Sequence, residues 1–130
     1  MDNESRMREN FLLMKRWMEN KNAGKSFSEY FQQCGYRSVA IYGAGDIGKL
    51  LFDELKQSDI QVKYFVDRNG EGIHEMAGLP VVAIHQVREM EEVDVLVVTL
   101  INAYDSICKM LAGFAKEIRT LSIREAVYEM

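Results

Sequence analysis

The sequence has little of what several classes of protein require. It contains two cysteines and two histidines in 130 residues, and none of them lies at the spacing of a metal site. No apolar run approaches the roughly 20 residues that cross a bilayer, and the acidic, polar N-terminus is unlike a secretory signal. The formal charge of −4 excludes a generally basic, nucleic-acid-binding surface. We therefore expect a cytoplasmic protein in which Cys34 and Cys108 are small, reduced core residues.

What is present fits one folded domain. The apolar fraction of 48% and the charged fraction of 28% are typical of a globular chain, and the length allows a single core. We divide the chain into a helical extension, residues 1–24, and a domain, residues 25–130. The capping box from Ser26 to Glu29 predicts that the domain begins with a short helix, which Gly35 ends in a left-handed conformation.

The extension carries apolar side chains at the spacing of an amphipathic helix. They lie at Met7, Phe11, Met14 and Met18, and three neighbours widen the stripe: Leu12, Leu13 and Trp17. One interpretation is that this face packs on its own domain. The other is that part of it binds a second copy of the chain or a partner enzyme, because a small domain cannot easily cover so wide a face.

From Ser38 onward, strand and helix patterns alternate. We expect strands at Ser38–Tyr42, Val62–Val66, Pro80–Ala83, Val93–Thr99 and Ile118–Ile123. Helices are expected after the first strand, weakly around Val87 and Met90, over Ala103–Ala115, and at the C-terminus. The segment Arg68–Leu79 includes Gly70, Gly72 and Gly78, which predicts a loop in place of a helix. The alternation predicts a Rossmann-like, doubly wound α/β fold with five parallel strands in the order 3-2-1-4-5.

A glycine-rich turn connects the first expected strand to its helix. It reads Gly43, Ala44, Gly45, Asp46, Ile47 and Gly48, and an acid, Asp67, follows nineteen residues after its last glycine. In this context the glycines allow a tight turn, a close approach of a pyrophosphate, and close packing of helix on strand. The amides at the helix start and the helix dipole would bind the phosphates. The alternative is that the turn maintains the fold and binds nothing.

Asp46 is the main objection to a phosphate at this turn. Its carboxylate could cap the helix itself, or point inward and repel an anion. Pointing outward, it could be offset by Lys49. The sequence leaves these alternatives open.

Further candidate ligands follow the second and fourth strands. Asp67 is placed to accept hydrogen bonds from ribose hydroxyls, and Arg68 could stack on adenine or hold a 2′-phosphate. Asp67 would repel that phosphate, so we favour NAD or a uridine nucleotide over NADP. Thr99 and Asn102 border the same crevice at the point where the strand order reverses, although such residues are common without a ligand.

A catalytic set is not found in the sequence. No tyrosine is followed by a lysine four positions later, and the serine-elbow, zinc-protease and phosphate-loop motifs are missing. His74 could act as an acid or base near a ligand, but a solvated loop residue is the simpler interpretation, and His85 is expected to start the weak helix.

From about Ser26 onward the chain resembles small Rossmann-like domains of bacterial surface-polysaccharide biosynthesis. These are the N-terminal domains of nucleotide-sugar dehydratase/epimerases and of sugar acyltransferases. The resemblance is carried by Val39–Gly48, by Phe65–Asn69, by the G-L-P-V of Gly78–Val81, and by Val93–Thr99. It implies that Gly43, Gly45, Gly48 and Asp67 contact NAD(P) or the nucleotide of a nucleotide-sugar.

Together these features predict a stand-alone nucleotide-binding module of nucleotide-sugar or polysaccharide metabolism. The ligand would be NAD, NADP or a UDP-sugar, and the module would be dimeric or would complete or regulate a partner enzyme. One alternative is a minimal NAD-dependent oxidoreductase or epimerase with its site between subunits. Another is an NAD-sensing regulatory domain.

Overall fold

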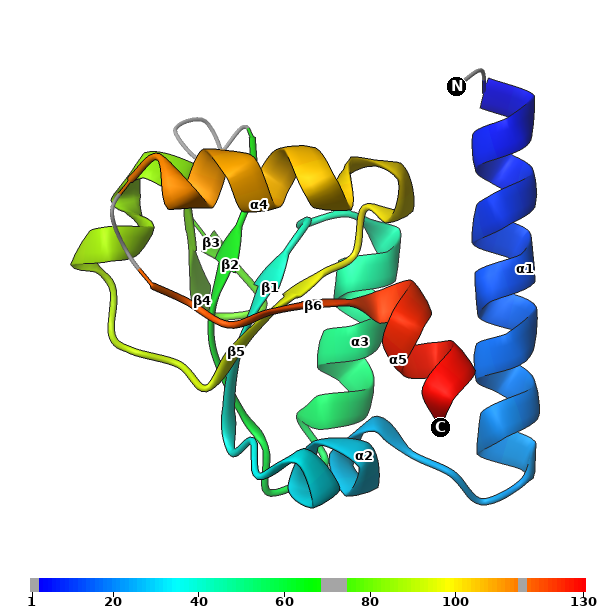
Figure 1. Ribbon diagram of the computed structural model, residues 1–130. Coiled ribbons are helices and arrows are strands. Elements are labelled where there is room, and N and C mark those ends of the chain that lie inside the picture. The colour runs from blue at the N-terminus through cyan, green and yellow to red at the C-terminus, as the bar shows by residue number, and fades with distance from the viewer. Residues whose placement is uncertain (1–2, 69–74, 115–116) are drawn as a thin grey trace.

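The computed structural model describes residues 3–68, 75–114 and 117–130. The chain begins with two helices, and strands and helices then alternate to the C-terminus (Figure 1). The helices are α1 (Asn3–Asn22), α2 (Phe27–Cys34), α3 (Asp46–Leu55), α4 (Tyr104–Ala112) and α5 (Ile123–Glu129), with 3₁₀ helices η1 (Ile84–Glu89) and η2 (Ile101–Ala103). The strands are β1 (Ser38–Tyr42), β2 (Gln61–Val66), β3 (Glu75–Met76), β4 (Leu79–Val82), β5 (Val95–Val98) and β6 (Thr120–Ser122).

The sheet is mixed and has six strands, in the order β3-β4-β2-β1-β5-β6. Five of them run parallel, and their order is the predicted one, but the prediction of five strands in all is wrong. The additional strand, β3, pairs antiparallel with β4 through a two-residue turn at Ala77 and Gly78, both with positive φ. Such turns suit the twist of a hairpin. A two-residue strand is too short to show an alternating pattern, so the sequence did not reveal it.

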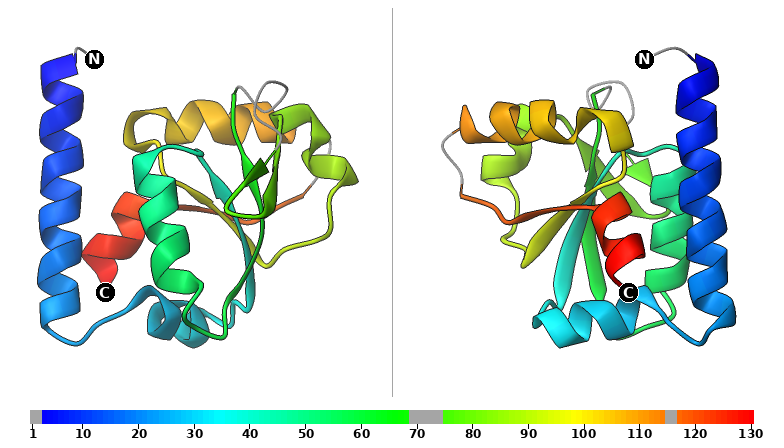
Figure 2. Two further views of the ribbon diagram at one scale, coloured as in Figure 1. Left: turned by 180° about the vertical axis from the view of Figure 1, so that it is seen from behind. Right: turned by 45° about the vertical axis from the view of Figure 1, so that its right-hand side comes forward.

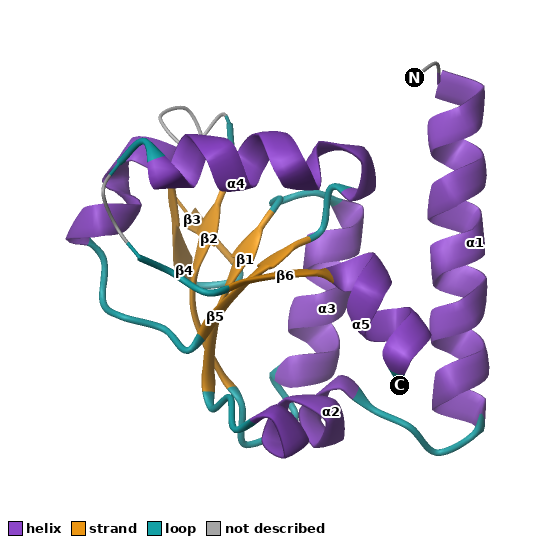
Figure 3. Cartoon of the chain, in the orientation of Figure 1, coloured by secondary structure: helices purple, strands orange, loops and turns teal. Residues whose placement is uncertain are grey.

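Helices cover both faces of the sheet (Figures 2 and 3). Alternate residues of the strands point to opposite sides, so one face presents Val39, Ile41 and Phe65 to a core shared with α1, α2, α3 and α5. The other face presents Ala40, Tyr64 and further strand residues to α4 and η1. The central strands are buried on both faces, as their continuous apolar runs predict.

Tyr64 lies on the α4 side of the sheet with an unpaired hydroxyl. The side chain is fully buried, and its oxygen has no hydrogen-bond partner among the described residues. Burial raises the pKa of Tyr64 to about 12. We predict that Tyr64→Phe, which removes the unpaired oxygen and keeps the ring, raises the free energy of unfolding by about 1 kcal/mol. Urea denaturation measures this change, and a destabilised variant would contradict the prediction.

Several other expectations are corrected in detail. The weak helix near Val87 and Met90 is the 3₁₀ helix η1, and the helix expected over Ala103–Ala115 is confirmed as α4, which spans Tyr104–Ala112 and follows η2. Cys34 is exposed rather than buried, because it ends α2 on the solvent side; Cys108 is partly buried, and both thiols are free. The capping contact is confirmed, since the amide of Glu29 donates to the Ser26 hydroxyl at 3.2 Å. Gly70, Gly72 and His74 lie outside the described residues.

The helix α1 is joined to the domain along one side only. Leu13 and Trp17 enter the core, and the buried amide of Asn20 donates to the carbonyl oxygen of Val127 at 2.8 Å. The Trp17 indole nitrogen donates to Glu54 of α3 at 3.0 Å. The first interpretation of this helix is therefore confirmed for Leu13 and Trp17, whereas the stripe of Met7, Phe11, Met14 and Met18 stays largely exposed to solvent. No helix in the described part of the chain combines the length and apolar character needed to span a membrane.

Candidate functional site

A crevice lies at the carboxyl ends of β1, β2 and β5. Its volume is about 620 Å³, and it is bordered by the glycine turn, by the residues after β2, and by the segment from Thr99 to η2. The strand order changes direction here: from β1 the chain first adds β2 on one side and later adds β5 on the other. This is the position at which open α/β sheets bind ligands. All ten residues predicted as ligands are described; eight of them line the crevice, and Gly43 and Ala44 form the turn beside it.

Two glycines of the turn are required by the fold itself. Gly43 has a φ of +110°, and a Cβ there would come within 2.2 Å of the Thr99 hydroxyl oxygen. A Cβ on Gly48 would come within 1.9 Å of the Gly43 carbonyl oxygen, because α3 presses directly against the turn. Both residues therefore have a structural explanation that needs no ligand.

Gly45 has no such explanation. Its φ of −93° is open to other residues, and a Cβ built on it would meet nothing within 4 Å. Gly45 is exposed, borders the crevice and is the N-cap of α3, so the missing side chain leaves open space at the start of the helix. The fold does not need a glycine here, whereas a ligand approaching the backbone does.

Asp46 begins α3 and is exposed at the edge of the crevice. Within the described chain, no hydrogen bond joins its carboxylate to the first turn of the helix, so the self-capping alternative does not apply. Its charge still faces the crevice. Two acids, Asp46 and Asp67, and two arginines, Arg6 and Arg68, line it, so a bound anion would depend on the backbone amides.

Asp67 connects the end of β2 to the glycine turn. Its Oδ2 accepts a hydrogen bond from the Ala44 amide at 2.8 Å, and its own amide donates to the Val82 carbonyl oxygen. Asp67, which the sequence predicts to bind a ribose, thus also holds the glycine turn in place. The pKa of the neighbouring Tyr42 is raised by burial and by the charge of Asp67, against the opposing effect of Arg68. The carboxylate therefore acts on the crevice as a local negative charge.

Thr99 has a structural role in addition to its place at the crevice. It is buried, and its hydroxyl donates to the Tyr42 carbonyl oxygen at 2.7 Å, which ties the end of β5 to that of β1. The hydroxyl proton of Thr99 is therefore already donated in a hydrogen bond within the protein. Asn102 belongs to η2, and it lines both the crevice and an adjoining pocket.

Arg6 and Asn10 of α1 also line the crevice, and neither was predicted from the sequence. They lie at helical spacing from Leu13 and Trp17 and so continue the side of α1 that faces the domain. Arg6, Asn10, Leu13 and Trp17 thus form a second stripe along α1. In the sequence it is less evident than the apolar stripe of Met7, Phe11, Met14 and Met18. The extension is consequently part of the candidate site.

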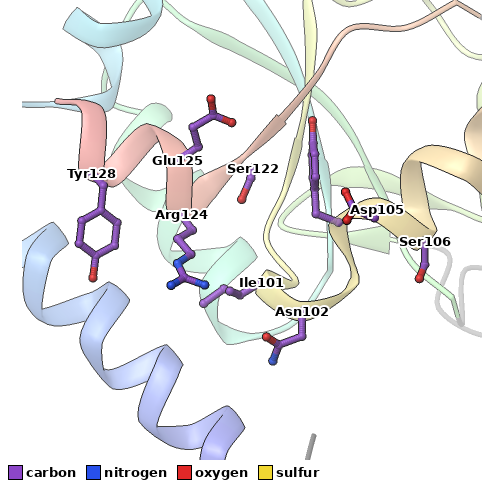
Figure 4. A pocket seen from close by; sticks show the side chains of 9 residues that line it. Ile101, Asn102, Asp105, Ser106, Ser122, Arg124, Glu125 and Tyr128 are labelled. Carbon is purple, nitrogen blue, oxygen red and sulfur yellow. The ribbon is translucent and has the colours of Figure 1, made fainter.

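The adjoining pocket lies between η2, the start of α4 and α5 (Figure 4). It has a volume of about 530 Å³ and shares Ile101 and Asn102 with the crevice. In Figure 4 the guanidinium group of Arg124 points toward Ile101, and the side chains around the pocket are mostly polar. The two spaces together offer room for a ligand longer than a single nucleotide.

A family model matches residues 35–120 of the chain, from the end of α2 to the first residue of β6. Its description is C2185-like, N-terminal. The chain belongs to this family. The C2185-like match includes the glycine turn, Asp67, Thr99 and Asn102, and it excludes α1 and α5. No curated protein matches the chain. The resemblance to polysaccharide-biosynthesis domains stays a prediction.

Proposed function

We propose that the crevice binds the pyrophosphate of a nucleotide, either NAD(P) or a nucleotide-sugar such as a UDP-sugar. The chain would act as a nucleotide-binding module of nucleotide-sugar or surface-polysaccharide metabolism, and it would complete or regulate a partner enzyme. The observation that carries this proposal is Gly45. Its missing side chain serves no packing or backbone purpose in the described structure and opens the start of α3 to the crevice.

The other residues of the crevice fit such a ligand. Phosphates beside Gly45 would accept from amides of the first turn of α3 and gain from its dipole. Arg6 and Arg68 supply positive charge that offsets Asp46 and Asp67. A ribose would lie toward Asp67 at the end of β2, and the group beyond the pyrophosphate would extend past Asn102 toward Arg124.

Calorimetric titration of the chain with NAD, NADP, UDP and UDP-glucose tests this function. We expect binding of at least one of them at millimolar affinity or better, with NAD or a uridine nucleotide preferred to NADP. Failure of all four to bind at millimolar concentration would contradict the proposal.

The substitution Gly45→Val separates binding from folding. The new side chain would occupy the space beside the amides, so we predict at least a tenfold loss of affinity for whichever nucleotide binds. The free energy of unfolding should change by only about 1 kcal/mol, since no atom obstructs the side chain and only the N-cap preference is lost. Ala23→Val, in the exposed turn after α1, is the matched control and should bind like the wild type. Equal affinity of all three proteins would show that the ligand does not approach Gly45.

A further inference from the structure

The regular stripe of α1 is exposed to solvent. The exposed fractions are 71% for Met7, 62% for Phe11, 43% for Met14 and 59% for Met18. We call these four residues the outer stripe. Figure 1 shows α1 as the outermost helix, with no other element on its far side. Apolar side chains gathered in this way on a soluble protein mark an interaction surface.

A groove between α1 and α3 continues this surface. It has a volume of about 370 Å³, and its lining includes Met14 and Met18 of the outer stripe and Leu50 of α3, which is 41% exposed. Asp53 and Glu54 of α3 line the same groove together with Lys21 of α1, so this side of the outer stripe carries two acids and one lysine. The surface therefore has an apolar centre and an acidic edge.

We propose that the outer stripe pairs with the outer stripe of a second copy of this chain, with the two α1 helices parallel. Its residues are spaced four, three and four positions apart, the spacing of a heptad seam. With Leu50 they expose on the order of 500 Å² of apolar surface, so that two copies would reach the roughly 1,000 Å² expected of a specific interface. This proposal does not depend on the identity of any nucleotide.

Charge favours a second copy in the parallel orientation. Arg8 and Lys15 directly follow Met7 and Met14 and so flank the outer stripe on the side away from α3. In a parallel pair related by a two-fold axis along the helices, this basic flank meets the acidic flank of the other copy. In an antiparallel pair, like flanks would meet.

Each acid of this flank already pairs with a lysine of the same copy. Lys21 pairs with Glu54 at 3.5 Å and Lys56 pairs with Asp53 at 3.2 Å. Glu19 lies farther from the seam than Lys15 and weakens the basic flank. The charges therefore favour the parallel orientation only modestly, and the apolar seam supplies the affinity.

Light scattering coupled to gel filtration tests the interface. At about 100 µM the wild-type chain should have about twice the mass of the 15.0 kDa monomer, and Met14→Asp should be monomeric. Met110→Asp is the matched control, because Met110 of α4 is 46% exposed and lies away from the outer stripe; it should remain dimeric. A monomeric wild type, or a Met14→Asp variant that remains dimeric, would overturn the proposal. Circular dichroism establishes that each variant is folded.

Disulfide formation tests the orientation. In a chain whose own cysteines are replaced, Cys34→Ser and Cys108→Ser, the further change Met18→Cys should give a disulfide-linked dimer on mild oxidation. In a parallel pair the two introduced thiols lie across the seam, whereas in an antiparallel pair each lies opposite the other end of the stripe. A dimer that forms no such disulfide would overturn the parallel arrangement.

Discussion

Gly48→Ala should lower the free energy of unfolding by about 3 kcal/mol or more, a large share of the roughly 5–15 kcal/mol typical of a folded domain. The added Cβ would lie 1.9 Å from the Gly43 carbonyl oxygen and 3.1 Å from its carbonyl carbon, far inside van der Waals contact. Backbone atoms held by the sheet cannot move aside as a flexible side chain can. The turn and α3 would have to separate, which would disturb the core beneath Ile41.

Gly45→Ala is the matched control for this prediction. It makes the same chemical change three residues earlier, where the new atom meets nothing within 4 Å. Thermal and urea denaturation should place Gly45→Ala within about 1 kcal/mol of the wild type and Gly48→Ala far below it. Equal stability of the two variants would show that α3 does not pack against the turn as described.

Glu54→Ala should lower the free energy of unfolding by about 3 kcal/mol and loosen α1 from the domain. The Glu54 carboxylate accepts from the Trp17 indole nitrogen at 3.0 Å and from the Phe27 amide at 2.8 Å, and it pairs with Lys21. It therefore links α1, the start of α2 and α3. Alanine would leave two donors without an acceptor in a largely buried place, and that loss costs more than an exposed ion pair contributes.

Urea denaturation measures the loss, and hydrogen exchange of the Trp17 indole proton reports whether α1 separates. Glu91→Ala is the control. It removes an ion pair with Lys63 in which the Glu91 side chain is 69% exposed. The free energy of unfolding should therefore fall by less than about 0.5 kcal/mol. A Glu54→Ala variant as stable as Glu91→Ala would contradict the linking role.

Much of the sheet could be predicted because strands that are buried on both faces appear in the sequence as continuous apolar runs. Val95–Val98 is apolar throughout, and the glycine turn follows β1 and opens α3 as expected. The two-residue β3 could not be predicted, because its pairing depends on the Ala77–Gly78 turn and on the position of β4. The exposure of Cys34 likewise depends on which side of α2 meets the core.

The α1 helix shows the main limit of prediction from sequence. The sequence left open whether its apolar face packs on the domain or binds a partner, and in the structure only Leu13 and Trp17, at the edge of that face, enter the core. Periodicity identifies an amphipathic helix but does not decide between two apolar sides, since the choice depends on the surface that receives the helix. The same choice brings Arg6 and Asn10 to the crevice.

The sequence predicted where the candidate site lies, but it predicted the hydrogen bonding of that site only in part. The turn, Asp67 and the end of β5 do meet in one crevice. Hydrogen bonds within the protein could not be predicted, and they give the Thr99 hydroxyl and the Asp67 Oδ2 structural roles. These contacts depend on the three-dimensional register of β1, β2 and β5.

Amide NMR spectra recorded during titration with NAD and with UDP-glucose test the central claim most directly. If a pyrophosphate binds at the start of α3, the largest shift changes should fall on the amides of Gly45, Asp46, Ile47 and Gly48, with smaller changes near Asp67 and Asn102. Spectra that do not change at millimolar nucleotide, or changes confined to residues outside the crevice, would contradict the account.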